Sequence, residues 1–222
     1  MTRVLVFDLD GTLIDSAPDI HAAANRLLAE EGLPPQPFAA LRRMIGHGVP
    51  HLIDVLLKAT GQPPDPVRDT RLSARFVAGY EEAVALTRPY PFVPETLDLL
   101  TAAGHRIGLC TNKPLAAVRA VLAHLDLAQH FPVIVAGDSA CPRKPDPAPL
   151  HAAIAELGGG PATYIGDHEV DAATARAAGV PFLLFTEGYR SAPATALTTR
   201  AFADWRSLPP LVRWTPAGDR DV

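Results

Sequence analysis

The most constraining feature of the sequence is a run of four apolar residues near its start, Val4–Phe7, which ends abruptly in the segment Asp8-Leu-Asp-Gly-Thr12. An apolar run without alternation is typical of a strand buried on both faces, and such strands belong to parallel sheets covered by helices. Comparable short runs recur at residues 106–111, 133–136, 163–165 and 181–185. We therefore expect a parallel sheet built around the first strand.

Helix-like segments alternate with these runs, for example at residues 94–103 and 115–125. Strands and helices in alternation predict a doubly wound, Rossmann-like α/β sheet. About ninety residues separate the first strand from the second, far more than a crossover connection needs. We predict an α/β core from residues 1–15 and 89–222, and an all-helical cap domain inserted at residues 16–88.

The predicted cap contains a first helix that ends before Gly32 and three more helices, at residues 38–44, 49–60 and 67–86. Ser16 is expected to be the N-cap of the first helix, and Asp19, three residues on, would complete a capping box.

Composition limits the partners and the location of the protein. The 222 residues are 48% hydrophobic and 20% charged, which is ordinary for a globular protein. A net charge of −4 leaves no basic excess to neutralise nucleic-acid phosphates. The two cysteines, Cys110 and Cys141, do not suggest a disulfide framework, and neither a signal peptide nor a membrane-spanning stretch is visible. We expect a cytoplasmic protein with no nucleic-acid or membrane partner, either a monomer or a homodimer.

Two carboxylates stand where the first strand ends. Asp8 and Asp10 are two residues apart, so along an extended chain they project to the same side. In open parallel sheets, ligands bind beyond the carboxyl ends of the strands, where one carboxylate can attack an electrophile and another can transfer a proton. Gly11 would let backbone N–H groups approach an anion. A pair of solvent-facing loop aspartates explains the spacing equally well.

Other strand ends carry residues suited to binding phosphate. Thr111 and Asn112 offer hydrogen bonds to phosphate oxygens, although they are also common at helix starts and turns. Lys144, held beside a proline, would be a fixed positive charge. Asp167 follows a later strand and Asp171 lies on the first turn of the next helix, whereas His168 and Glu169 are expected to point outward without a chemical role.

The four aspartates would meet at one edge of the sheet. Two like charges about 4 Å apart repel by roughly 4 kcal/mol at an effective dielectric constant of 20. A hard divalent cation relieves this repulsion, and magnesium suits a site shared with phosphate and water. The sequence therefore predicts a Mg²⁺-dependent phosphate-processing enzyme.

These segments together resemble the haloacid dehalogenase superfamily of phosphotransferases, whose four motifs occur here in order. The resemblance implies that Asp8 is a nucleophile that becomes an aspartyl phosphate and that Asp10 is the general acid and base. It implies that Thr111 and Lys144 bind phosphate. The metal would be held by Asp8, the backbone carbonyl of Asp10, and Asp167, with Asp171 interacting from behind these ligands.

The helical insertion resembles the cap of the phosphoglycolate phosphatase subgroup. The likeness rests on Asp15-Ser-Ala-Pro-Asp19, on Arg43-Met-Ile-Gly-His-Gly-Val-Pro50 and on Lys144-Pro-Asp-Pro-Ala-Pro149. It implies hydrolysis of 2-phosphoglycolate, and His47 between two glycines could offer a cation to the substrate carboxylate. An ordinary interhelix turn with an exposed histidine is the alternative.

Two other functions stay open at this point. A phosphatase or a mutase of another small metabolite, such as a sugar phosphate, would use the same aspartyl phosphate. The sequence does not separate these functions, because caps select substrates by detailed shape. A non-enzymatic receiver-like signalling domain also gathers aspartates and a lysine around magnesium. Receivers, however, are shorter and have no helical insertion after the first strand.

Overall fold

A six-stranded parallel sheet forms the centre of the protein in this computed structural model, which describes residues 3–80, 83–139 and 142–212. Cys141 and the tail from residue 213 lie outside the described residues. The strand order is β5-β4-β1-β6-β7-β8. The strands are β1 (Val4–Phe7), β4 (Arg106–Cys110), β5 (Val133–Val135), β6 (Ala162–Gly166), β7 (Phe182–Phe185) and β8 (Ala201–Phe202). The predicted doubly wound α/β fold is confirmed.

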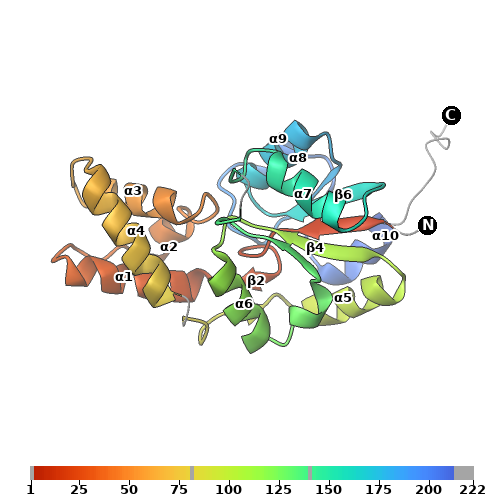
Figure 1. Ribbon diagram of the computed structural model, residues 1–222, viewed down its shortest axis with the longest axis horizontal. Coiled ribbons are helices and arrows are strands. Elements are labelled where there is room, and N and C mark those ends of the chain that lie inside the picture. Colours follow the sequence, from red (N-terminus) through yellow and green to blue (C-terminus); the bar gives the residue numbers. More distant parts are fainter. Residues whose placement is uncertain (1–2, 81–82, 140–141, 213–222) are drawn as a thin grey trace.

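Strand β1 pairs with β4 on one side and β6 on the other, and its side chains pack against a helical layer on each face of the sheet. Leu5 and Phe7 belong to a buried cluster with α5 (Val93–Ala102), α6 (Leu115–His124) and α10 (Leu208–Val212). Val4 and Val6 point to the other face, toward α7 (Ala148–Glu156) and α8 (Glu169–Ala178). Figure 1 shows these two helical layers on opposite sides of the strands. The unbroken apolar run is thus explained by burial on both faces.

Four helices lie beside the sheet, at the left of Figure 1, and supply most of a second hydrophobic cluster, which Ala117 and Tyr189 of the core join. We call them the four-helix region: α1 (Ala17–Glu30), α2 (Phe38–Arg42), α3 (Val49–Ala59) and α4 (Pro66–Tyr80). A two-stranded antiparallel ribbon, β2 (Ile14–Asp15) with β3 (Arg88–Pro89), brings together the chain segments that lead into and out of this region. The sequence analysis did not anticipate this ribbon.

The predicted capping box at the start of α1 is wrong. The Ser16 hydroxyl donates instead to Asp10 Oδ1 (2.5 Å), and the Tyr189 hydroxyl accepts the Ser16 backbone N–H (2.7 Å). Asp19 accepts the backbone N–H (2.7 Å) and the hydroxyl (2.6 Å) of Thr87. Both polar side chains serve long-range contacts that local spacing could not reveal.

The predicted helix at residues 67–86 is also too long, because α4 is helical to Tyr80 and residues 83–86 are irregular. Leu86 donates its backbone N–H to Asp19 (3.0 Å), a bond that holds this segment against α1. The remaining short elements are η1 (Ala128–His130), α9 (Ala194–Leu197) and η2 (Trp205–Ser207). Among the described residues no helix has the length and apolar character needed to cross a membrane.

Candidate active site

The candidate site lies beyond the carboxyl ends of three adjacent strands. Asp8 follows β1, Thr111 follows β4 and Asp167 follows β6. The Asp8 backbone N–H donates to the Ile165 carbonyl (2.9 Å), so sheet pairing continues to the aspartate itself. Because the strands are parallel, their ends meet at one edge, and residues more than 150 apart in sequence become neighbours, as the Thr12–Asp167 hydrogen bond illustrates.

Three buried carboxylates form the acidic centre of the site. Asp8, Asp167 and Asp171 each offer an oxygen within 4.8 Å of the other two. Burial raises the pKa of Asp8 to about 7, against the lowering effect of Lys144. Burial and the charges of Asp171 and Asp8 raise the pKa of Asp167 well above its ordinary value. The raised pKa values reflect burial first and repulsion between the carboxylates second, and a bound cation would favour the ionised forms.

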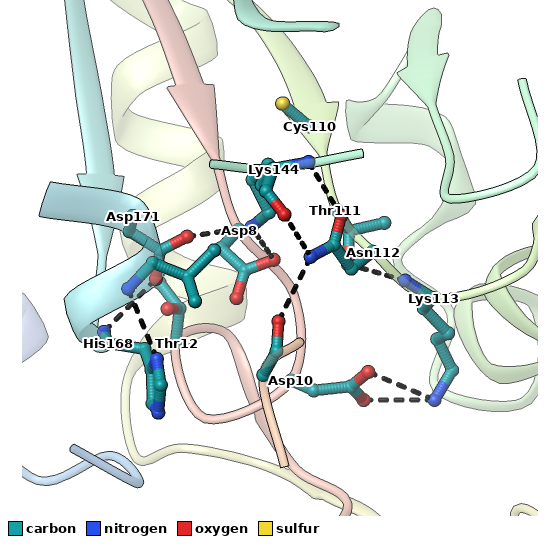
Figure 2. Close-up of polar contacts among 12 residues, drawn as sticks. Asp8, Asp10, Thr12, Cys110, Thr111, Asn112, Lys113, Lys144, His168 and Asp171 are labelled. Atoms are coloured by element: carbon teal, nitrogen blue, oxygen red, sulfur yellow. Dashed lines mark hydrogen bonds and ion pairs between the residues drawn. The ribbon is translucent and has the colours of Figure 1, made fainter. Parts of the chain in front are cut away.

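Lys144 neutralises part of this charge. Its Nζ lies 2.8 Å from Asp8 Oδ1 and 2.7 Å from Asp171 Oδ1 (Figure 2). It also donates to the Tyr164 hydroxyl (2.8 Å). Its side chain is only 2% exposed. Burial alone would lower the pKa of Lys144, but the two carboxylates raise it above the ordinary value, so the ammonium stays charged. Burial raises the pKa of Asp171, but Lys144, His168 and the Tyr164 hydrogen bond together lower it below the ordinary value, so that carboxylate stays ionised.

The geometry of Asp167 and Asp171 is fixed by backbone and hydroxyl donors. Asp167 accepts the Thr12 hydroxyl (2.7 Å) and the Tyr189 backbone N–H (2.6 Å). Asp171, on the first turn of α8, accepts the backbone N–H of His168 (3.0 Å). Gly11 has a φ of +88°, and a Cβ there would collide with the Asp167 carboxylate. Glycine at position 11 is thus required by the close packing of this carboxylate.

Asp10 occupies a separate position from the three clustered carboxylates. Its Oδ1 accepts the Ser16 hydroxyl (2.5 Å) and lies 2.9 Å from Lys113 Nζ, whose distance to Oδ2 is 3.3 Å. Lys113 is 3% exposed, and its ammonium also donates to the Tyr80 hydroxyl at the end of α4. The sequence analysis gave Lys113, Ser16 and Tyr80 no role in the site, and the only available signal was that Lys113 directly follows Thr111-Asn112.

Thr111 and Asn112 differ in their surroundings. Thr111 is buried at the wall of the cleft described below, where its hydroxyl accepts the Lys113 backbone N–H (3.3 Å). The Asn112 side chain binds the backbone of Lys144, accepting its N–H (3.0 Å) and donating to its carbonyl (3.1 Å), and also donates to the Gly46 carbonyl (3.1 Å). Asn112 therefore positions Lys144 and ties the core to the four-helix region.

A cleft with about 480 Å³ of empty space, part of it open to solvent, lies between the core and the four-helix region. The core contributes mainly polar groups and the helices mainly apolar ones. Its lining residues are Asp8, Asp10, Thr111, Asn112 and Lys113 from the core, and Ile20, Met44, Ile45, Gly46, Gly48, Val49, Leu52, Phe76 and Tyr80 from the helical side.

His47 lies between two glycines that line this cleft, and its own ring packs against His51 (centroids 4.5 Å apart) and His168 (5.2 Å). Burial and the neighbouring histidines lower the pKa of His47, which favours the neutral imidazole. The expectation that His168 points outward is wrong: it is buried, and its ring lies against Gly46. The loop from the four-helix region covers it, a contact that its sequence position does not indicate.

The site combines an acidic edge of the sheet, a buried lysine and a helical insertion after β1, and known proteins share this combination. A family model for haloacid dehalogenase-like hydrolases matches residues 2–179. The chain belongs to the haloacid dehalogenase-like hydrolases. The resemblance of the four sequence motifs is thereby confirmed.

Relatives of this haloacid dehalogenase-like hydrolase include phosphatases. A phosphoglycolate phosphatase of Cereibacter sphaeroides is 51% identical over 211 residues, which cover 94% of this chain and 97% of the relative. One of Rhodobacter capsulatus is 41% identical over 97% of this chain and 99% of its own length. A crystal structure from Haemophilus somnus, of a protein described as a predicted phosphoglycolate phosphatase, has a TM-score of 0.86 at 28% identity and covers 96% of this chain and 98% of that one. The protein is a phosphatase of this family.

Proposed function

We propose that the protein hydrolyses 2-phosphoglycolate to glycolate and phosphate through a phosphorylated Asp8, with Mg²⁺ as its cofactor. The observation that carries the proposal is the placement of Asp8 at the floor of the cleft, in contact with Lys144 and beside two further buried carboxylates. The names of the curated relatives support the choice of substrate.

In the first step a carboxylate oxygen of Asp8 attacks phosphorus, and the bond from phosphorus to the glycolate oxygen breaks. Asp10 gives its proton to that leaving oxygen. In the second step Asp10 takes a proton from water, whose oxygen attacks the phosphorus of the aspartyl phosphate. The bond to Asp8 breaks, inorganic phosphate leaves, and both carboxylates return to their starting state.

Binding of the phosphoryl group falls to residues around Asp8. Lys144 supplies a buried positive charge and Thr111 a hydroxyl. The Gly11 N–H, expected from the sequence to approach the anion, donates instead to the Ile14 carbonyl (2.8 Å). Asn112 acts by holding the Lys144 backbone. These groups would stabilise the charge on the equatorial phosphoryl oxygens in both steps.

The acidic centre fits a hard divalent cation, since three buried carboxylates face one another and the Lys144 ammonium contacts two of them, Asp8 and Asp171. Asp8, Asp167 and the backbone carbonyl of Asp10 would hold Mg²⁺, and Asp171 would support this set from behind. A bound Mg²⁺ supplies the positive charge that keeps Asp8 ionised and offsets the charge of the phosphoryl oxygens.

The four-helix region is proposed to act as a cap domain, residues 16–88, over a core of residues 1–15 and 89–222. Its cleft-facing side chains would exclude water and select the leaving group. His47 is proposed to contact the substrate from the loop whose glycines line the cleft. A cytoplasmic location is part of the proposal, because the substrate is a soluble phosphorylated metabolite.

A substrate panel tests the proposal. Purified protein with Mg²⁺ is assayed for phosphate release from 2-phosphoglycolate, glucose 6-phosphate and p-nitrophenyl phosphate. The highest kcat/KM is expected for 2-phosphoglycolate. Turnover of the aryl ester without turnover of 2-phosphoglycolate would refute the substrate assignment. A preference for the sugar phosphate would assign the enzyme to sugar-phosphate metabolism. No turnover of any ester would fit a receiver-like domain.

A further inference from the structure

Lys113 is a cation in the cleft that the proposed mechanism leaves without a task. Among the described residues that line the cleft it is the one with a positive side chain; Lys144, 2.8 Å from Asp8, is not part of the lining. The carboxylate nearest to Lys113 is Asp10, at 2.9 Å, and the proposed first step needs Asp10 in its protonated form, which leaves the ammonium without a balancing charge in that step. A buried ammonium is costly unless paired and hydrogen-bonded, so its presence in this wall calls for an explanation.

The position of Lys113 relates directly to the leaving group. Asp10 must lie within hydrogen-bond reach of the leaving oxygen in order to protonate it. Lys113 contacts Asp10, so its ammonium stands next to the space that the leaving group fills. In 2-phosphoglycolate a single methylene separates the leaving oxygen from the carboxylate. A carboxylate bound there would come within reach of Lys113.

Tyr80 completes the donor set at this point of the cleft. The Lys113 ammonium donates to the phenol oxygen, so the phenol proton is available to a second acceptor. Burial and nearby aspartates raise the pKa of Tyr80 well above its ordinary value, which keeps that proton in place. Tyr80 is the last residue of α4, and its contact with Lys113 therefore joins the four-helix region to the core.

The rest of the helical wall selects against larger polar substrates. Ile20, Leu52 and Phe76 face the cleft, together with Val49 and Met44. A sugar phosphate would bury several hydroxyl groups against these side chains without hydrogen-bond partners, at a cost of about 1–3 kcal/mol each. A short leaving group with one anionic end matches both the apolar wall and the single cation.

We propose that Lys113, assisted by the Tyr80 hydroxyl, binds the carboxylate of the substrate and so makes the enzyme specific for short phosphate esters that carry a second anionic group. This inference rests on the proposed phosphatase reaction at Asp8. It assigns the cation for the carboxylate to Lys113, whose buried side chain lines the cleft, and not to His47, whose ring packs against His168.

The experiment compares 2-phosphoglycolate with ethyl phosphate, which lacks the carboxylate. For each variant the ratio of kcat/KM for 2-phosphoglycolate to kcat/KM for ethyl phosphate is measured with Mg²⁺. Lys113→Gln is expected to lower kcat/KM for both substrates, because Asp10 loses its partner. It is also expected to lower the ratio of the two values by about 100-fold. Lys113→Arg should recover part of the ratio, and Tyr80→Phe should lower it by about 5-fold. Lys58→Gln, which removes an exposed lysine of α3, is the matched control and should leave the ratio unchanged.

Binding provides a readout that a structural role of Lys113 would not move. Calorimetry with the inactive Asp8→Asn protein should show that adding Lys113→Gln weakens the binding of 2-phosphoglycolate much more than the binding of ethyl phosphate. Equal losses for the two ligands, or an unchanged kinetic ratio in Lys113→Gln, would overturn the inference. If Lys113→Gln does not fold, an unchanged ratio in Tyr80→Phe overturns it. A wild-type ratio near one would instead refute the proposed substrate.

Discussion

The raised pKa of Asp8 predicts that the metal-free protein loses stability as the pH rises. Asp8 has a pKa of about 7 in the folded protein against 3.8 as the ordinary value, chiefly because it is buried. The folded state therefore holds this proton more tightly than the unfolded state. Its contribution to stability is fully present below the unfolded pKa and is lost as the pH rises through the folded pKa.

The size of the effect follows from these two values. Between about pH 5 and about pH 8, linkage of one carboxyl with these pKa values removes about 2.6 kcal/mol from the free energy of unfolding. Asp167, whose pKa is also raised, acts with the same sign. Asp171, whose pKa is lowered, has the opposite sign, but it is ionised in both states across this window and adds no slope.

The assay is urea unfolding of chelator-treated protein at both pH values, with Asp8→Asn as the matched control. The asparagine keeps the shape of Asp8 and cannot titrate, so subtracting its pH profile removes the histidines and other groups. The wild-type protein should lose about 2–3 kcal/mol more than the variant, and saturating Mg²⁺ should abolish this difference by stabilising the ionised carboxylates. Parallel pH profiles of the unfolding free energy for the two metal-free proteins would refute the claim that burial raises the pKa of Asp8.

Three further outcomes are expected. Asp10→Asn should lower kcat by roughly 10²–10⁴-fold while the protein stays folded, since it removes proton transfer in both steps; steady-state kinetics with circular dichroism would measure this, and an unchanged kcat would exclude the role. Lys144→Met should destabilise the protein by roughly 3–5 kcal/mol, because Asp8 and Asp171 lose their ammonium partner; denaturant unfolding would measure it, and a loss below about 1 kcal/mol would contradict the described ion pairs. Chelator should abolish turnover and added Mg²⁺ should restore it, so activity that persists in the dialysed, chelator-treated enzyme would contradict the proposed cofactor.

The strands of the core could be predicted because burial on both faces leaves a strong sequence signal. Val4–Phe7 has no polar residue to break the run, and β4 to β7 could be predicted from similar short apolar runs. β8 and the β2–β3 ribbon are each two residues long, too short to show any periodicity. The capping box of α1 and the end of α4 were predicted wrongly, because Asp19 hydrogen-bonds a segment distant in sequence.

Parts of the site could be predicted for a related reason. Asp8, Thr111 and Asp167 each follow a parallel strand, and parallel strands place their carboxyl ends at one edge. Lys113 and Tyr80 could not be found this way, because their contact depends on how α4 packs over the core. A lysine in a polar loop is usually exposed, and only tertiary structure reveals that this one is buried.

The account depends most directly on Asp8 becoming phosphorylated during turnover. The decisive measurement mixes enzyme and Mg²⁺ with 2-phosphoglycolate, quenches the reaction within a turnover, and locates the acyl phosphate by borohydride reduction and peptide mass spectrometry. The account predicts modification of Asp8 in the wild-type protein and none in Asp8→Asn, which should also be inactive. A phosphoryl group on another residue, or turnover by Asp8→Asn, would contradict it.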